Sequence, residues 1–554
     1  MILQNLVFPQ EDCQCDALYV RRHDSDEGEC IDFCSYFNMF PVTRWRKYTG
    51  ISDIYLDIES GGQMTLVLIG VRSDGCREEL SRTTVSGHDR VCIPDTDHEL
   101  VGVHLIIPHG SEFIQGSFCT ESSVERMPMM ALNMCTFHRE SLALAKMQSF
   151  IASLERFGEP YSSHVKMIVV DNGSTLDDFD HASVDVVRNS NIGGSGGFAR
   201  GLYEARHTMS DLTHILFMDD DTVMDFESVY RVFSLLCYLK PEYSGYMIAG
   251  SMLSMEKPYE VYESGTALPS NEPLCHGIDV SDVHGISSLD SSPGPDVGGW
   301  WFFCSPHVSS DDYPMPFFVG YDDVAYSWMH GSSVISMVGI GVWHPDLNAS
   351  YRPSRQFYYD IRNSMFLNAL QGHGSKRDIV LHFKRGVKEI LFMRPRNADL
   401  ISMALYDFSR GCTVLDDPIG INSRVQPVAY DIQKGKSPDV DPIEHVRNRK
   451  LWTALTLNGQ LLSSRGVGKA SKTCLDAWCS YRVQRMIHHD DGSGWFVTEK
   501  DVWKSIRSIS SLLISTVRAL IKDGYVRRNL SENNHEVSES YWEDMFDRIG
   551  LKDD

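Results

Sequence analysis

The 554-residue sequence lacks the features of several specialised protein classes. It has no apolar run of the roughly 18 residues that a membrane-spanning helix needs, and its start, Met1–Leu6, lacks the basic segment and long apolar core of a secretory signal. It is also short of positive charge, because 51 Lys and Arg residues stand against 75 Asp and Glu, a net charge of −24. Nucleic-acid binding needs clustered cations. We therefore predict a cytoplasmic globular protein with no nucleic-acid partner.

A zinc-ligand pattern is also missing from the sequence. Cys13, Cys15, Cys30 and Cys34 form the only close group of cysteines, and no second cysteine pair or histidine pair completes a set of ligands. We interpret the cysteines as reduced structural thiols of a cytosolic protein. Internal repeats and low-complexity tracts are absent as well, which argues against a repeat or disordered architecture.

The N-terminal part, residues 1–128, is rich in short β-type runs. Two of them, at 54–58 and 64–69, are separated by Gly61-Gly62, which predicts a turn, and a third lies at 101–107. Closely spaced strands without helices between them predict a β-sandwich or barrel.

Beyond this part the pattern changes twice. Residues 129–365 alternate strand-like and helix-like segments, which predicts a doubly wound α/β domain whose ligands bind beyond the carboxyl ends of the strands. Residues 366–554 are predicted to be mainly helical, with amphipathic helices at 378–393 and 498–522 and a long connection at 416–442, where Pro and Gly are frequent. The expected fold class is multidomain, with a β part, an α/β part and a helical part.

Asp219, Asp220 and Asp221 form the strongest local signal for function. They follow the strand-like run 214–218, and a divalent cation would relieve the repulsion among three adjacent carboxylates. Asp219 and Asp221 point to the same side of an extended segment, so one could bind a metal and the other a nucleotide's sugar. The alternative is a solvated acidic turn before a helix that starts near Asp225. The position at the end of a buried strand favours a functional role.

A glycine-rich run, Asn191–Arg200, provides a second signal. Glycines let the backbone approach a ligand closely, and the helix start that follows offers amide donors to an anion. The run does not match the GxGxxG pattern and has no Walker lysine, so neither a dinucleotide-binding fold nor a P-loop is predicted. A purely structural turn is the alternative.

Three further groups carry weaker signals. Trp300 and Trp301 follow two glycines and suit the apolar face of a sugar, although ordinary core is the alternative and only one of two adjacent strand residues can face a pocket. Asp322 and Asp323 precede a helix-like segment, which they could cap, or where one could act as a general base. His344 ends an apolar strand, where a structural histidine is more common than a ligand. Its imidazole would suit manganese or iron better than magnesium.

Several segments, taken in order, carry a resemblance to a known family. They are Tyr36–Pro41, Trp45–Thr49, Thr136–Arg139, Asn191–Phe198, Phe217–Asp221, Gly299–Trp301, Tyr321–Asp323, Val342–His344 and Tyr359–Asn363. Together they resemble the inverting GT-A glycosyltransferases of family 2, and more closely the mycobacterial polymerising galactofuranosyltransferases. The resemblance covers about residues 1–365.

This resemblance implies a GT-A fold for the α/β domain and an inverting transfer of galactofuranose from UDP-galactofuranose to a hydroxyl of a growing cell-surface glycan. It implies that Mn²⁺ or Mg²⁺ stabilises the departing UDP and that one base deprotonates the acceptor. The implied residues are Arg139, Asn172, Asn191, Asp219 and Asp220 for the donor, Asp219, Asp221 and His344 for the metal, Trp300 and Trp301 for the acceptor, and Asp323 and Asp322 for catalysis.

Two departures from the family concern the acceptor. Gly320 stands where the family has a lysine, and the segment 270–296 does not match. We expect a glycan or lipid-linked glycan acceptor at the inner face of the cell membrane, where basic residues between 376 and 396 could make a peripheral contact or form a solvated helix face. A homo-oligomer stays open. The rival hypotheses are a family 2 enzyme with another donor, such as a rhamnosyl or glucosyl nucleotide, and a non-catalytic glycan-binding protein.

Overall fold

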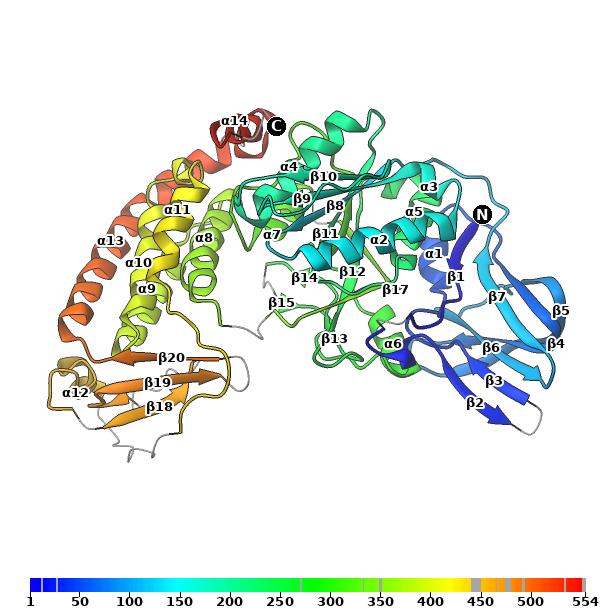
Figure 1. The fold of residues 1–554 in the computed structure, drawn as a ribbon, viewed down its shortest axis with the longest axis horizontal. Helices are drawn as coiled ribbons and strands as arrows, with labels where there is room; N and C mark the ends of the chain where they lie inside the picture. The colour runs from blue at the N-terminus through cyan, green and yellow to red at the C-terminus, as the bar shows by residue number, and fades with distance from the viewer. Residues whose placement is uncertain are drawn as a thin grey trace.

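The computed structural model arranges three parts in a row, with an N-terminal sheet and C-terminal helices on opposite sides of a central α/β domain (Figure 1). It describes residues 1–10, 13–25, 28–269, 272–331, 333–347, 351–439, 450–464, 466–472, 474, 480–490, 494–532 and 535–550. Within these ranges no helix is both long enough and apolar enough to cross a membrane.

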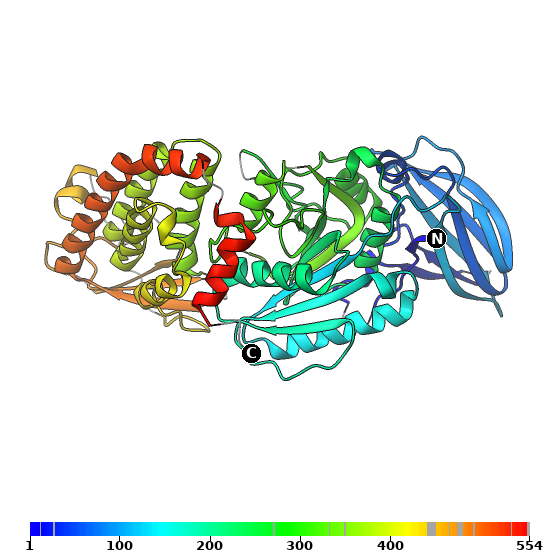
Figure 2. The same ribbon diagram turned by 90° about the horizontal axis from the view of Figure 1, so that it is seen from above.

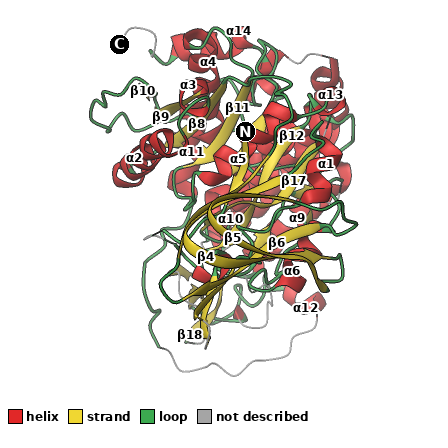
Figure 3. Cartoon of the chain, turned by 90° about the vertical axis from the view of Figure 1, so that its right-hand side faces the viewer, coloured by secondary structure: helices red, strands yellow, loops and turns green. Residues whose placement is uncertain are grey.

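The N-terminal part is one antiparallel sheet, ordered β1-β7-β4-β6-β3-β2, with β5 paired to β4. Figure 3 shows its long, curved strands from the side. Its elements are β1 (Ile2–Asn5), β2 (Arg21–Ser25), β3 (Gly28–Asp32), α1 (Val42–Tyr48), β4 (Tyr55–Val71), β5 (Arg77–Cys92), β6 (Leu100–Pro108) and β7 (Glu112–Cys119).

The prediction of a turn at Gly61-Gly62 is wrong, because β4 continues through both glycines. β5 pairs with β4 on both sides of them, and the register shifts between Ser60 and Gln63. Gly62 has a φ of +113°, which a side chain rarely allows. The two glycines therefore form a bulge inside one long strand and not a loop between two short ones.

The N-terminal part, predicted as a β-sandwich or barrel, is a single folded sheet. One edge of β4 pairs with β7 before the bulge and with β6 after it, so the sheet divides into two branches. Phe33, next to β3, and Phe113, on β7, belong to different branches, yet their ring centroids lie 5.5 Å apart. The branches therefore face each other and enclose apolar side chains as two separate sheets would.

The central domain spans β8 to β17. Its elements are β8 (Met130–Thr136), α2 (Glu140–Phe157), α3 (Tyr161–His164), β9 (Val165–Asp171), β10 (Val184–Arg188), α4 (Gly193–Thr208), β11 (His214–Asp219), α5 (Glu227–Tyr238), β12 (Met247–Ser254), β13 (Val261–Glu263), β14 (Thr266–Ala267), β15 (Glu272–Pro273), α6 (Val283–Asp290), β16 (Phe302–Ser305), α7 (Asp322–Met329) and β17 (Val334–His344). The predicted glycine-rich turn is instead the first turn of α4.

The central sheet is ordered β10-β9-β8-β11-β16-β12-β13, with β17 paired to β12. β10, β9, β8 and β11 are parallel, and β16 runs antiparallel to β11. On β11, Ile215 and Phe217 pack in the core cluster that includes α4, whereas Leu216 and Met218 pack in the cluster that includes α2 and α5. Because helices cover both faces of the sheet, the prediction of an α/β domain is confirmed.

The N-terminal sheet and the central domain share one hydrophobic core. At their junction Asn5 of β1 donates its backbone N–H and its side-chain amide to Glu227 of α5, at 2.7 and 2.9 Å. Arg231 donates to the same carboxylate at 3.1 Å. The predicted boundary near residue 128 therefore marks a change of architecture and not a gap between separate cores.

The C-terminal part is helical, as predicted, but it also contains a small sheet. Its elements are α8 (Asp360–Leu370), α9 (Lys376–Leu391), α10 (Pro395–Phe408), α11 (Pro418–Val425), α12 (Lys450–Leu455), β18 (Val467–Ser471), β19 (Arg485–Asp490), β20 (Gly494–Glu499), α13 (Val502–Glu532) and α14 (Glu539–Arg548). α11 interrupts the connection predicted at 416–442, whose last three residues lie outside the described ranges.

The sheet of β18, β19 and β20 corrects the sequence prediction, which placed residues 498 and 499 in a helix. They belong to β20 because Phe496 of this strand is buried in an aromatic cluster, stacked on Tyr351, Tyr430 and His488. α13 starts only at Val502.

The chain then returns to the central domain. Figure 2 shows α14, in red, against this domain. Glu539 pairs with Arg206 of α4 at 2.9 Å, and the indole N–H of Trp542 donates to the carbonyl oxygen of Pro314 at 3.1 Å. The C-terminal helix thus ties the end of the chain to the outer helix of the α/β domain.

Candidate active site

The loops after β8, β9 and β11 meet at one edge of the central sheet, because these strands are adjacent and parallel. Asp219 ends β11, and Asp221 follows it. β17 brings His344 to the same edge from far along the sequence. Its Trp343 exchanges two backbone hydrogen bonds, each 2.8 Å long, with Val223.

Asp219, Asp221 and His344 form a cluster that can hold a metal ion. Nε2 of His344 lies 3.2 Å from Oδ1 of Asp221 and 3.6 Å from Oδ2 of Asp219. Burial disfavours the charged imidazole, but hydrogen bonds to the two carboxylates outweigh it and raise the pKa of His344 to about 10. Burial also opposes ionisation of Asp221, yet His344 and Arg139 lower the pKa of Asp221 to about 2.

Two carboxylates and one imidazole are a donor set that suits Mn²⁺ and also accepts Mg²⁺. A cation bound there would take the place of the proton on His344. The structure brings together the three side chains that were predicted as metal ligands.

Asp220, predicted to contact the donor, is buried and is held by two side chains of the protein. Its Oδ2 accepts a hydrogen bond from Oγ1 of Thr136 at 2.7 Å, and its Oδ1 accepts one from Nη1 of Arg139 at 2.7 Å. The same Nη1 donates to Asp221 at 2.7 Å. Asp220 therefore positions Arg139 beside the metal cluster, and neither of its oxygens is left without a partner.

Asn172 and Asn191, also predicted to hold the nucleotide, brace the start of α4. Asn172 is buried; it donates to the carbonyl oxygen of Gly193 at 3.0 Å and accepts from Asn189 at 2.7 Å. Oδ1 of Asn191 accepts from the N–H of Gly193 at 3.1 Å. Gly193 has a φ of +82°, and a Cβ there would lie 2.1 Å from the carbonyl oxygen of Phe318. Only glycine permits this contact between α4 and the loop before α7.

Asp322 and Asp323 begin α7 after a strained turn in which Phe318, Gly320 and Tyr321 all have positive φ. Asp322 is buried and accepts a hydrogen bond from Oγ of Ser195, on α4, at 2.9 Å. Burial, and next the negative charge of Asp322, raises the pKa of Asp323 to about 7. A carboxylate with such a pKa is suited to accept a proton near neutral pH.

Comparison with curated proteins gives two matches to galactofuranosyltransferases named GlfT2. The chain is 22% identical over 458 residues to the GlfT2 of Mycolicibacterium smegmatis, covering 74% of this chain and 68% of that protein. It is 24% identical over 433 residues to the GlfT2 of Mycobacterium tuberculosis, covering 69% and 65%. The chain is a glycosyltransferase that resembles GlfT2.

No protein-family model matches the glycosyltransferase. Among solved structures it is similar to the mannosyltransferase PcManGT from Pyrobaculum calidifontis in complex with GDP-Man and Mn²⁺, with 11% identity, a TM-score of 0.27, and coverage of 56% of this chain and 84% of that one. It is also similar to the catalytic domain of Drosophila β1,4-galactosyltransferase 7, with 12% identity, a TM-score of 0.20, and coverage of 40% and 66%.

A cavity of about 460 Å³ opens beside Asp323. Its other lining residues come from the β13–β15 region, from the start of α7 and the turn before it, and from the segment that leads into α8. They are Tyr262, Glu263, Thr266, Pro273, His276, Gly320, Tyr321, Val324, Leu347, Arg352, Arg355, Gln356 and Asp360. Sequence analysis missed Arg352 and Arg355, because two arginines in an irregular segment give no periodic signal. The sequence signal that could have pointed to these two arginines is their position shortly after His344.

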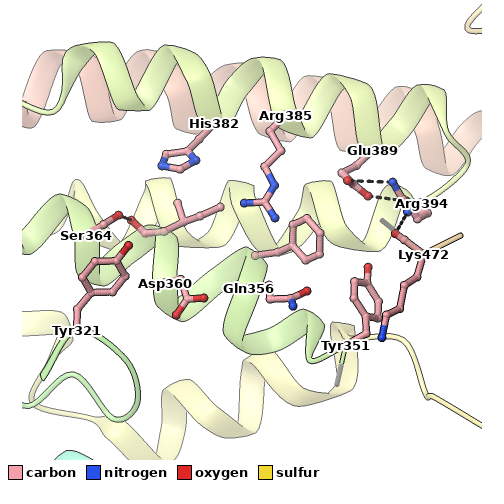
Figure 4. A pocket seen from close by; sticks show the side chains of 12 residues that line it. Tyr321, Tyr351, Gln356, Asp360, Ser364, His382, Arg385, Glu389, Arg394 and Lys472 are labelled. Carbon is pink, nitrogen blue, oxygen red and sulfur yellow. Dashed lines mark hydrogen bonds and ion pairs between the residues drawn. The ribbon is translucent and has the colours of Figure 1, made fainter. Parts of the chain in front are cut away.

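A second cavity, of about 400 Å³, shares Tyr321, Gln356 and Asp360 with the first and extends into the helical part (Figure 4). Arg385 of α9 points into it and lies over the ring of Phe357, with 4.4 Å from Cζ to the centroid. Because Tyr321, Gln356 and Asp360 line both cavities, the two cavities adjoin each other along these residues.

Arg394, which also lines the second cavity, lies within the predicted basic surface at 376–396 but is not part of an exposed face. Arg394 is buried and pairs with Glu389 at 2.7 Å, so it contributes no charge to an outer helix face.

Trp300 and Trp301, predicted to line the acceptor site, are both buried in the core. Trp300 packs on Phe217 with ring centroids 4.7 Å apart and on Phe198 at 5.0 Å. The indole N–H of Trp301 donates to the carbonyl oxygen of Gly250 at 3.0 Å. Neither ring lines either of the two cavities. Both tryptophans are therefore ordinary core residues, which was the alternative to an acceptor-binding role.

Proposed function

We propose that this glycosyltransferase moves galactofuranose from UDP-galactofuranose to a hydroxyl of a growing cell-surface glycan, with inversion at the anomeric carbon. The observation that carries the proposal is the pair of features at the carboxyl edge of the sheet, namely the Asp219–Asp221–His344 cluster and the Asp323 cavity. The names of the two relatives support the choice of sugar.

Asp219, Asp221 and His344 would hold Mn²⁺ or Mg²⁺, which supplies charge neutralisation for the diphosphate of the leaving UDP. Arg139, fixed by Asp220, lies beside that position. Asp323 accepts the proton of the acceptor hydroxyl while the oxygen attacks the anomeric carbon. The bond from that carbon to the UDP oxygen breaks, and UDP leaves with the electron pair. Displacement from the opposite face inverts the configuration.

The acceptor would occupy the cavity at Asp323 and continue along the shared residues into the second cavity. That cavity offers aromatic faces at Tyr351 and Phe357 and polar side chains at Gln356 and Ser364, a mixture that suits sugar rings. Burial, and next the charge of Arg385, lowers the pKa of His382 to about 4, so its ring is neutral at physiological pH and can hydrogen-bond hydroxyls.

We propose the inner face of the cell membrane as the place of reaction. On α13, Trp503, Ile514 and Ile521 are exposed, and their spacing of 11 and 7 residues puts them on one face of the helix. α9 packs beside α13 and exposes Lys384 and Lys388. An exposed apolar stripe and exposed lysines on two neighbouring helices suit an anionic lipid surface.

A mixed-donor assay tests the sugar. Purified protein with Mn²⁺ is offered UDP-galactofuranose, UDP-galactopyranose and a dTDP-rhamnose donor together with a galactofuranosyl acceptor. We expect transfer from UDP-galactofuranose alone. Transfer from only one of the other donors would refute the choice of sugar, and no transfer from any donor would favour a non-catalytic glycan-binding protein.

A further inference from the structure

Three side chains with metal-binding chemistry meet on the N-terminal sheet, in a different domain from the active site. His23 of β2 pairs directly with Cys30 of β3, and Cys30 pairs with Ile106 of β6, two residues from His104. Directly paired residues, and residues two apart on a strand, lie on the same face of a sheet. The three side chains therefore share one face.

The geometry of these groups is close to that of a metal site. One ligand atom from each of His23, Cys30 and His104 lies within 4.8 Å of the others. The two imidazole centroids are 6.2 Å apart with an interplanar angle of 40°, so the rings lie close together without stacking. In a tetrahedral zinc site, bond lengths of 2.0–2.3 Å place the ligand atoms roughly 3.4–3.6 Å apart. Small rotations, for which the exposed His23 has room, would close the difference.

A second observation points to a ligand at this place. Nε2 of His104 is buried and has no hydrogen-bond partner within the described part of the chain. Buried polar atoms are normally satisfied, so an unpaired nitrogen on an imidazole of this cluster calls for a bound species. Asp32, on the same face, is paired with Arg77 at 3.3 Å and with Arg21 at 3.7 Å.

We propose that His23, Cys30 and His104 bind a zinc ion, with water as the fourth ligand. One thiolate and two neutral imidazoles form the soft and borderline donor set that selects zinc, whereas the active-site cluster of two carboxylates and one imidazole favours manganese or magnesium. Binding releases the thiol proton of Cys30 to solvent. The ion would fasten β2, an edge strand of the sheet, to β3 and β6.

The test measures zinc retained by the full-length protein. The chain is incubated with equimolar Zn²⁺ in excess Mg²⁺, desalted, and analysed by elemental mass spectrometry. We expect one zinc per chain for the natural sequence and less than one tenth of that for His23→Ala, Cys30→Ser and His104→Ala. His88→Ala, which removes an exposed histidine from β5 of the same domain, is the matched control and should keep its zinc.

His23→Ala is the decisive variant, because this side chain is exposed and its loss leaves the core intact. Replacement of zinc by Co²⁺ should give a thiolate charge-transfer band that is absent in Cys30→Ser. Asp221→Asn should retain zinc, and loss of zinc in that variant would assign the ion to the active site and overturn the proposal. Absence of zinc from the natural protein, or retention by His23→Ala, would overturn it as well.

Discussion

Replacing Asp323 with Asn should abolish most of the transfer activity and, at the same time, stabilise the protein. A general base contributes roughly 10²- to 10⁴-fold to a rate, so kcat should fall by that factor while UDP binding changes little. The stability gain follows from the raised pKa of Asp323, about 7 against an ordinary 3.8. At ~1.4 kcal/mol per pKa unit, a shift of ~3 units corresponds to ~4 kcal/mol, and contact with cavity water reduces this to ~1–3 kcal/mol.

The sign of the pH dependence follows from linkage. A carboxyl whose pKa is raised by folding contributes its full stability below the unfolded pKa and loses it as pH rises through the folded pKa. Asn does not titrate, so Asp323→Asn should match the natural protein near pH 4 and exceed it in stability above pH 7. Urea unfolding at both pH values and a transfer assay measure the two effects. An equal stability difference at both pH values, or a retained transfer rate, would refute the reasoning.

Three further predictions follow from single contacts. His344→Ala removes a metal ligand and should raise the Mn²⁺ concentration needed for half-maximal activity at least ~100-fold, as a Mn²⁺ titration would show; an unchanged titration would exclude the cluster as the metal site. Gly193→Ala should cost ~2–4 kcal/mol in urea unfolding, because φ is +82° and the new Cβ would lie 2.1 Å from a carbonyl oxygen, whereas Gly194→Ala, with its nearest atom at 3.9 Å, should change stability by less than ~0.5 kcal/mol. Arg139→Ala removes the hydrogen-bond partner of Oδ1 of the buried Asp220 and leaves only the Thr136 bond at Oδ2; because the Arg139 side chain is 40% exposed, we expect a loss of ~1–2 kcal/mol, and a stability equal to that of the natural protein would show that the pair is not formed.

The parts of the fold with a strong local pattern could be predicted from the sequence. The alternation of apolar strands and amphipathic helices predicted the α/β domain, and the position of Asp219 and Asp221 after a buried strand predicted their place at the sheet edge. Periodicity did not predict that β4 passes through Gly61-Gly62, because the pairing with β5 that keeps the strand extended is not a local property. The small sheet that contains Phe496 depends in the same way on contacts with distant aromatic rings.

The candidate site likewise has features that only contacts between distant parts of the chain produce. His344 joins Asp219 and Asp221 only because β17 lies beside β12, which no local spacing reveals. Asp220 carries the same side chain as its neighbours, and only the structure shows that its carboxylate is buried against Thr136 and Arg139. Close spacing in the sequence does not reveal the cluster of His23, Cys30 and His104, because strand pairing brings His104 to the other two residues from far along the chain.

Product analysis tests the central claim most directly. The protein is incubated with UDP-galactofuranose, Mn²⁺ and a short galactofuranosyl acceptor, and the product is examined by mass spectrometry for chain length and by NMR for anomeric configuration. We predict extension by galactofuranose with a configuration inverted relative to the donor, and no extension with Asp323→Asn. Retention of configuration, or an acceptor left unextended by UDP-galactofuranose but extended by another sugar nucleotide, would contradict the account.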